Sequence, residues 1–129
     1  MTDRKLIDTA MEAMENSYSP YSRFKVGAAI ESMDGEVFTG CNIENAAYGS
    51  TMCAEAAAIA SAVSVGQRQF KRIAIISEAN TYCFPCGSCR QLLSEFSHDV
   101  EVLCARADGR YVSYRLTALL PMAFGKESL

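Results

Sequence analysis

Apolar residues recur at helical spacing near the start of the chain and gather into short runs further along it. Residues 3–16 carry an apolar stripe at this spacing, which predicts an amphipathic helix. The side chains on the stripe are Leu6, Ile7, Ala10, Met11 and Met14. Residues 24–31 and 36–42 are predicted strands, and the Asp34-Gly35 pair between them is typical of a hairpin turn.

The alanine-rich segment that follows predicts a second helix over residues 52–65. Ser50 or Thr51 is its candidate N-cap, and Gly66 is its expected C-terminal stop. After it, the continuous apolar run 73–76 predicts a strand. Because a strand with one solvated face would alternate, this one is expected to be covered on both faces.

The last third of the chain predicts one more helix, two strands and a short terminal helix. Pro85 favours a helix start immediately before CGSCRQLLSEF. Residues 100–105 and 111–116 are predicted strands, and Thr117 can cap a final helix that Pro121 ends. This order of elements predicts an α/β fold in which helices pack on the faces of a mixed five-stranded sheet.

Composition narrows the class of protein. Half of the 129 residues are hydrophobic and 21% are charged, which suits one globular domain over residues 1–129. The 12 basic residues are scattered among 15 acidic ones, so the basic patch of a nucleic-acid-binding protein is absent. No apolar run reaches the roughly 18–20 residues of a membrane span, and the charged N-terminus differs from a signal peptide. We therefore expect a cytoplasmic protein with neither a nucleic-acid nor a membrane partner.

Three of the six cysteines are spaced as ligands of one metal ion. Cys86 and Cys89 lie three apart at a predicted helix start, so one helical turn places both sulfur atoms on the same side. Cys53 occupies the same kind of position on the preceding helix. Free N–H groups and the dipole at a helix N-terminus favour thiolate over thiol. Three thiolates leave one position of a tetrahedral Zn²⁺ open, as catalytic zinc sites do.

Glu55 stands two residues beyond Cys53, where it can lie beside the open position without binding the metal. A carboxylate there can take a proton from a zinc-bound water and return it to a substrate nitrogen. Cys-Ala-Glu at 53–55 followed by Pro-Cys-Gly-Ser-Cys at 85–89 is the pattern typical of zinc-dependent deaminases.

Two other uses of these residues stay open. Cys83 lies three residues before Cys86, so it can also complete a closed, four-thiolate structural zinc site. Pro85 counts against that site, because it restarts the backbone between Cys83 and the helix. A non-catalytic zinc- or nucleoside-binding module is the other alternative, although it would leave Glu55 without a role.

Four longer motifs extend the pattern: PYSRFKVGAAI (20–30), GCNIENAAYGSTMCAE (40–55), PCGSCRQ (85–91) and LLPMAF (119–124). Together they resemble the small, three-cysteine class of cytidine deaminases over nearly the whole chain. The resemblance implies an α/β/α sandwich, one Zn²⁺ per subunit and a homotetramer with sites at subunit contacts. It also implies hydrolysis of cytidine and deoxycytidine to uridine and deoxyuridine, with release of ammonia, in pyrimidine salvage.

The resemblance assigns zinc binding to Cys53, Cys86 and Cys89 and proton transfer to Glu55. It also assigns the substrate contacts made within one subunit. Asn42 and Glu44 match a ribose-binding Asn-x-Glu, which suits the hydrogen bonding of an amide and a carboxylate. Phe24 matches the aromatic residue that packs on the pyrimidine, and the backbone around Ala54 would bind the polar edge of the base.

Three further positions match residues that act across a subunit contact. Ala46 and Tyr48 would approach the ribose of a neighbouring subunit, and Phe124 would close its site. Structural interpretations stay open beside these. Phe24 and Phe124 are equally typical of core residues, and Tyr48 of a turn hydroxyl. Asn42 and Glu44 are typical of a solvated strand edge.

The resemblance breaks at Ala56, where the family usually has arginine. Zn²⁺ with three thiolates has a net charge of −1, which makes it a poorer Lewis acid. An arginine beside the sulfur atoms would offset that charge. We expect the two helix N-termini and Arg90, directly after Cys89, to do so here, and a surface salt bridge is the alternative role for Arg90.

Deaminases of antibiotics such as blasticidin S also lack that arginine. A deaminase of another cytosine nucleoside is therefore the alternative function. The intact segment at 42–48 favours cytidine itself.

Overall fold

The structure, a computed structural model, describes all of residues 1–129. Its elements in chain order are α1 (Asp3–Met14), β1 (Val26–Ser32), β2 (Val37–Cys41), α2 (Ala54–Ser64), β3 (Phe70–Ser77), α3 (Gly87–Phe96), β4 (Glu101–Ala105), β5 (Tyr111–Arg115) and α4 (Leu116–Leu119), with single-turn 3₁₀ helices at Tyr48–Ser50 and Lys126–Ser128. The strands form one sheet in the order β2-β1-β3-β4-β5, in which only β3 and β4 run parallel. The expected mixed five-stranded sheet is confirmed.

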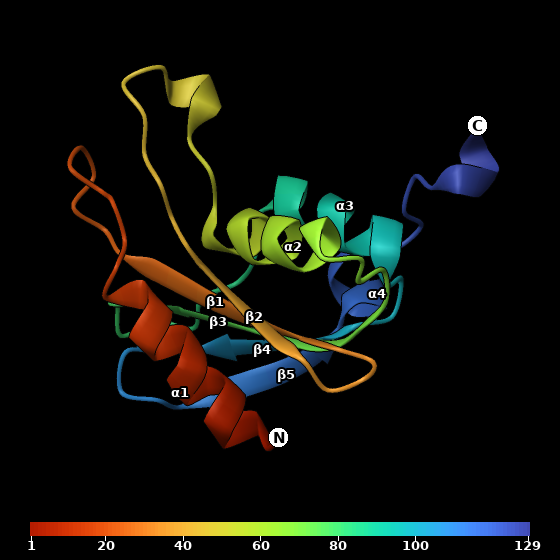
Figure 1. Cartoon of the computed structure of the whole chain (residues 1–129), viewed down its shortest axis with the longest axis horizontal. Coiled ribbons are helices and arrows are strands. Elements are labelled where there is room, and N and C mark those ends of the chain that lie inside the picture. The colour runs from red at the N-terminus through yellow and green to blue at the C-terminus, as the bar shows by residue number, and fades with distance from the viewer.

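Helices cover both faces of this sheet, with α1 on one side and α2 and α3 on the other (Figure 1). Successive residues of β3 alternate between the two resulting cores. Ile73 and Ile75 pack in the core under α2, whereas Ala74 and Ile76 pack in the core under α1. All four side chains are fully buried, so the strand is covered on both faces as its continuous apolar run predicts.

Two of the predicted helix caps are wrong. The N-cap of α2 is Cys53, because residues 48–50 form a separate 3₁₀ turn and the Thr51 hydroxyl accepts a hydrogen bond from the N–H of Asn45 at 3.2 Å. The N-cap of α4 is Arg115, since Thr117 lies inside the helix and its hydroxyl donates to Asp99 at 3.1 Å. The difference at α2 matters most for the site, because Cys53 itself is the N-cap of this helix.

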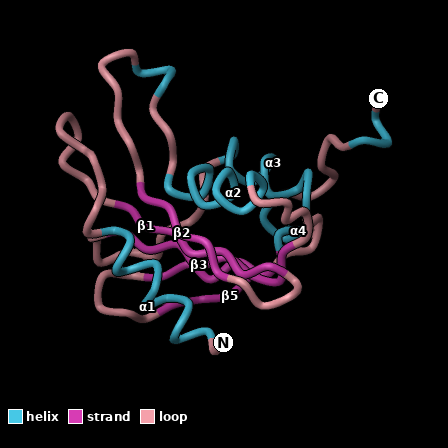
Figure 2. The backbone as a smooth tube through the Cα atoms, in the orientation of Figure 1, coloured by secondary structure: helices cyan, strands magenta, loops and turns pink.

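Two long connections extend from the sheet on the same side of the molecule (Figure 2). One joins α1 to β1 and the other joins β2 to α2. They are tied together where Tyr18 pairs with Ile43 in an isolated bridge. None of the helices is both long and apolar enough to cross a membrane.

Helix α2 lies unusually close to β2, where Gly40 has no side chain to hold it away. A Cβ added at Gly40 would lie 2.4 Å from the backbone nitrogen of Ala58 and 2.5 Å from the carbonyl oxygen of Ala54. Ala54, Ala58 and Ala62 are fully buried along the same side of the helix. The small residues therefore set the position of α2, and with it the position of Cys53 at its start.

We expect Gly40→Ala to lower the free energy of unfolding by about 3 kcal/mol, at the upper end of the penalty for overpacking, because the obstructing atoms are backbone. Thermal or urea unfolding measures the loss. Gly49→Ala is the matched control, since a Cβ there meets no atom within 4 Å. Equal stability of the two variants would contradict the close packing of α2 on β2.

Candidate metal centre and active site

The three cysteines expected to bind a metal lie together. The sulfur atoms of Cys53, Cys86 and Cys89 all lie within 4.8 Å of one another, and those of Cys53 and Cys86 are 3.8 Å apart. Cys53 is the N-cap of α2, Cys86 is the N-cap of α3, and Cys89 lies in the first turn of α3. Two helix N-termini therefore converge on one cluster of sulfur atoms, as the spacing predicts.

Hydrogen bonding within the cluster already favours one thiolate. Bonds from the thiols of Cys89 and Cys86 lower the pKa of Cys53 to about 6. The same interaction with Cys53 raises the pKa of Cys89, and burial adds to that rise. Neither Cys53 nor Cys86 uses its side chain to cap its helix, so the N-terminal dipoles of both helices also act on the sulfur atoms.

The donor set fits a zinc ion. Sulfur atoms that bind tetrahedral Zn²⁺ at about 2.3 Å lie roughly 3.8 Å from one another, which is the separation of Cys53 and Cys86. Cys83 is not a member of the cluster, and its backbone N–H bonds to Ala105 at 3.1 Å. Burial, followed by the charge of Glu55, raises the pKa of the Cys83 thiol to about 11. The geometry therefore favours the open, three-thiolate site over the closed alternative.

Glu55 lies in the first turn of α2 and is only 5% exposed. Burial raises the pKa of its carboxyl, and the neighbouring charge of Cys53 acts in the same direction. Its carboxylate forms no ion pair with any cation of the chain. A buried, unpaired carboxylate of raised pKa beside a metal site is suited to accept and return protons.

A cavity of about 290 Å³ lies in front of these residues and gathers most of the expected site. Its walls come from the start of β1, the end of β2, the start of α2 and the loop before α3. Of the expected residues it contains Phe24, Asn42, Glu44, Cys53, Ala54, Glu55 and Cys86. Cys89 is buried and is not among the residues that line the cavity. A second hollow of about 480 Å³ shares Glu44 and Thr51 with it and contains Tyr48.

Asn42 and Glu44 are more than solvated edge residues. The Asn42 side chain donates to the carbonyl of Phe24 at 2.8 Å and accepts from the N–H of Val26 at 2.9 Å. It also accepts a bond from the Ser17 hydroxyl. Hydrogen bonds to Glu44, first from the Ser22 side chain and then from its backbone, lower the pKa of the Glu44 carboxyl. Both polar groups are therefore held in fixed positions at the cavity wall.

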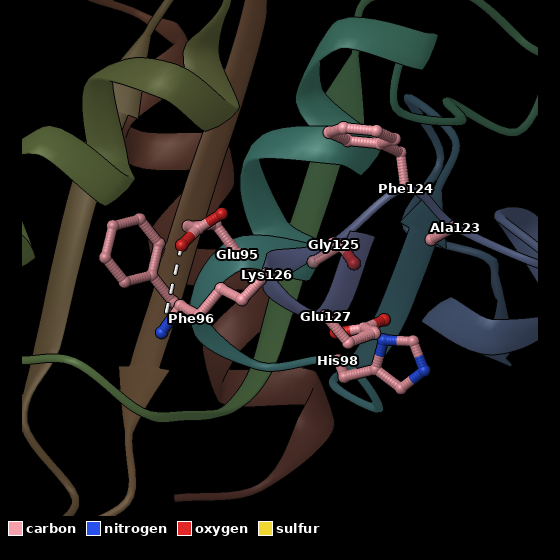
Figure 3. Close-up of a pocket in the computed structure, with 9 residues that line it drawn as sticks. Glu95, Phe96, His98, Ala123, Phe124, Gly125, Lys126 and Glu127 are labelled. Atoms are coloured by element: carbon pink, nitrogen blue, oxygen red, sulfur yellow. Dashed lines mark ion pairs between the residues drawn. The ribbon is translucent and has the colours of Figure 1, made fainter. Parts of the chain in front are cut away.

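The positions expected to act across a subunit contact lie away from the cluster in a single chain. Tyr48 is 80% exposed and Ala46 is also exposed, both in the connection before α2. Phe124 lies beside α3 in a different hollow, which is also lined by Glu95 and Lys126 (Figure 3). These two residues form an ion pair. With 61% of Phe124 exposed, a role for it as a core residue is wrong.

Arg90 does not fit either of its expected roles. Its Nε donates to the carbonyl of Pro85 and its Nη1 donates to the carbonyl of Leu119, each at 2.8 Å. It forms no hydrogen bond to a sulfur atom and no salt bridge, because these two backbone acceptors hold the guanidinium. Arg90 therefore links the loop before α3 to the end of α4. It does not supply the hydrogen bonds to sulfur that an arginine at position 56 would be expected to make.

The cavity also contains residues that the sequence did not point to. Val26, Thr51, Met52 and Phe84 line it together with Cys83. The ring of Phe84 is 45% exposed and packs against Tyr114 of β5, with the ring centroids 6.1 Å apart. The sequence could have indicated Phe84 as a site residue, because it directly precedes Pro85 and Cys86 and so lies in the same loop as a candidate metal ligand. The contact with Tyr114 had no signal in the sequence.

Comparison with known proteins points to one family. The sequence model described as the cytidine and deoxycytidylate deaminase zinc-binding region matches residues 1–105. A protein named cytidine deaminase from Sporosarcina psychrophila is 43% identical over 130 residues, covering all of this chain and 96% of the relative. A protein named blasticidin-S deaminase from Bacillus cereus is 33% identical, covering 95% of this chain and 91% of its own length.

Solved structures agree with this assignment. The crystal structure of cytidine deaminase from Burkholderia pseudomallei superposes with a TM-score of 0.93 at 44% identity, covering 96% of this chain and all of that one. The cytidine deaminase from Mycobacterium tuberculosis gives a TM-score of 0.84 at 40% identity over 97% of this chain. The three-layer α/β/α sandwich is therefore confirmed by similarity as well as by topology.

Proposed function

The chain belongs to the cytidine and deoxycytidylate deaminase family, and on that premise we propose that it hydrolyses cytidine and deoxycytidine. The products are uridine and deoxyuridine, and the amino group leaves as ammonia. The observation that carries the proposal is that the sulfur atoms of Cys53, Cys86 and Cys89 cluster beside a cavity. Cys53, Cys86 and the buried Glu55 line that cavity. A cytoplasmic location and a role in pyrimidine salvage are part of the proposal.

The three cysteines would hold one Zn²⁺ per subunit. Zinc bound there supplies Lewis acidity, which makes water a nucleophile near neutral pH. The helix N-termini at Cys53 and Cys86 stabilise the thiolates. Because Ala56 and Arg90 donate nothing to the sulfur atoms, these helix termini are the main compensation for the net negative charge of the site.

Glu55 is the proton carrier of the proposed reaction. It takes a proton from the attacking water and passes it to the amino nitrogen, which then leaves as ammonia. Its burial and its lack of a cationic partner keep its pKa raised, so the gain and the loss of the proton are both accessible. Ala54, fully buried beside it, places its backbone groups next to the polar edge of the base, and Phe24 packs on the ring.

The remaining hydrogen-bonding capacity of Asn42 and Glu44 matches one sugar hydroxyl. Asn42 Oδ1 already accepts two bonds, and one of its two N–H donors is used by Phe24. Glu44 accepts three bonds, from Tyr21 and Ser22, out of about four that a carboxylate accepts. One donor and one acceptor remain, and a single hydroxyl satisfies both. A single contact of this kind is compatible with both ribose and deoxyribose.

The cavity favours a nucleoside over a nucleotide. None of the residues lining the cavity or the adjoining hollow is Lys, Arg or His, and Glu44 contributes a negative charge to both. A 5′-phosphate entering either space would lie near this carboxylate without a cation to pair with, and like-charge contacts cost several kcal/mol.

We therefore expect kcat/KM for CMP and dCMP to be at least about 100-fold below that for cytidine and deoxycytidine, since every 1.4 kcal/mol corresponds to a factor of ten. Absorbance assays on the four compounds under one set of conditions measure the ratio. Comparable turnover of a nucleoside and its monophosphate would show that the phosphate is bound by groups outside the two hollows.

We also propose that the active form is a homotetramer. The high exposure of Tyr48 and Phe124 in a single chain supports contacts with neighbouring subunits, in which Ala46 and Tyr48 approach the sugar and Phe124 closes the cavity. Sedimentation equilibrium tests this part of the proposal. A monomer with full activity would remove the proposed role of these three residues.

A deaminase of a modified cytosine nucleoside is the second candidate, because Ala56 replaces the usual arginine and a blasticidin-S deaminase is among the relatives. A substrate panel of cytidine, deoxycytidine, cytosine and blasticidin S decides between the two. The first proposal expects the two ordinary nucleosides to react fastest, and faster turnover of blasticidin S would favour the second.

A further inference from the structure

A hydrogen-bond relay in the connection between α1 and β1 links the proposed sugar site to the proposed base site. The Ser22 hydroxyl donates to Glu44 Oε2 and accepts a bond from the backbone N–H of Phe24 at 3.0 Å. The other oxygen of Glu44 accepts bonds from the backbone N–H groups of Tyr21, at 2.9 Å, and of Ser22, at 3.1 Å. One hydroxyl therefore joins the carboxylate of the sugar site to the aromatic residue of the base site.

The carbonyl of Phe24 is also held by a side chain. Asn42 Nδ2 donates to it at 2.8 Å, and Asn42 Oδ1 accepts from the N–H of Val26 at 2.9 Å. Both backbone polar groups of Phe24 are thus fixed by side chains. The N–H is held through Ser22 and Glu44, and the carbonyl is held by Asn42 directly.

The backbone between Ser22 and Phe24 needs such support. Arg23 has φ of 58°, in the left-handed region that residues with a Cβ rarely adopt. Conformations of this kind persist only where the surrounding contacts enforce them. Here the N–H of Arg23 bonds to the carbonyl of Ser19 at 2.9 Å, and the Ser22 hydroxyl holds the residues on either side of Arg23.

We propose that Ser22 is a positioning residue that couples recognition of the sugar to packing of Phe24 on the base, an inference that rests on the proposed function. Its hydroxyl keeps the Glu44 carboxylate and the Phe24 backbone in one arrangement. Glu55 and the three cysteines lie on or next to α2 and α3, whereas the hydrogen bonds of the Ser22 hydroxyl go to Glu44 and Phe24. Loss of the hydroxyl therefore acts on binding of the nucleoside and leaves the chemical step largely unchanged.

Calorimetric titration of the zinc-loaded protein with uridine, the product, tests the proposal without turnover. Because a hydrogen bond to a charged group is lost, Ser22→Ala is expected to bind uridine about 10-fold more weakly. It should raise KM for cytidine by a similar factor, with kcat within about 3-fold of wild type. Ser22→Thr, which keeps the hydroxyl, should restore binding. Ser19→Ala is the matched control, since the Ser19 hydroxyl forms a hydrogen bond only with Ser17 and none with Glu44 or Phe24.

A double-mutant cycle with Phe24→Ala separates positioning from a general effect on the loop. If Ser22 acts through Phe24, Ser22→Ala should weaken uridine binding much less in the Phe24→Ala background than in the wild type. An equal effect in both backgrounds would overturn the proposal. So would unchanged uridine binding by Ser22→Ala, or a loss confined to kcat.

Failure of the proposed function gives a different result. A wild-type protein that binds uridine but leaves cytidine unchanged would refute the deaminase assignment, and the uridine comparison would still decide the role of Ser22. A wild-type protein that binds neither nucleoside would overturn both proposals.

Discussion

Replacing Glu55 with glutamine is expected to lower kcat for cytidine by about 10²–10⁴-fold, the range that a positioned general acid–base supplies. Glutamine has nearly the same shape but neither takes nor returns a proton at the site. Because Glu55 is buried beside the cysteines and is not one of the clustered ligands, the variant should keep one zinc per chain. Steady-state rates together with metal analysis of the same preparation measure both quantities.

The control for this variant is Glu15→Gln, which makes the same change at an exposed carboxylate after α1 and should leave the rate unchanged. Loss of zinc from Glu55→Gln would mean that Glu55 holds the metal site together. Retention of zinc with wild-type turnover would remove Glu55 from the reaction altogether.

Cys86→Ala is expected to lose both zinc and activity. Removing one of three thiolates should weaken zinc binding by more than the roughly 10–100-fold that follows loss of an outer-shell partner. Since binding of a structural or catalytic metal adds to folding free energy, the melting temperature of the zinc-loaded protein should fall as well. Metal content after dialysis against a weak chelator and thermal unfolding with and without zinc measure these effects.

Cys83→Ser is the matched comparison, because Cys83 lines the same cavity but lies outside the sulfur cluster. It should keep one zinc per chain under the dialysis that strips Cys86→Ala. Equal loss of zinc from both variants would support a closed four-thiolate site instead, and with it a structural role for the metal.

Local sequence patterns predicted the elements and the chemical core of the site. The burial of residues 73–76 on both faces of the sheet was predicted from their continuous apolar run. The Cys-Ala-Glu and Pro-Cys-x-x-Cys spacing predicted that Cys53, Cys86 and Cys89 lie together. These features depend on periodicity and on helix starts, which are properties of neighbouring residues. The sequence could therefore specify them without knowledge of the tertiary structure.

The features that could not be predicted depend on distant partners. The guanidinium of Arg90 bonds to the carbonyl of Leu119, 29 residues away, instead of supporting a thiolate. The Ser22 hydroxyl donates a hydrogen bond to Glu44, 22 residues away in the sequence. In both cases tertiary contacts decide the hydrogen-bond partner, and local propensity does not report on them. The N-cap of α2 differs for a local reason: a 3₁₀ turn at Tyr48–Ser50 precedes the helix, so Cys53 is the cap instead of Ser50 or Thr51.

The central claim is that the protein deaminates cytidine in the cavity beside the three cysteines. Its most direct test is to incubate the zinc-loaded protein with cytidine and to follow ultraviolet absorbance and ammonia in the same samples. The account predicts conversion to the spectrum of uridine with one ammonia released per uridine formed, and loss of both signals in Glu55→Gln. A protein that carries one zinc per chain and leaves cytidine unchanged would contradict it.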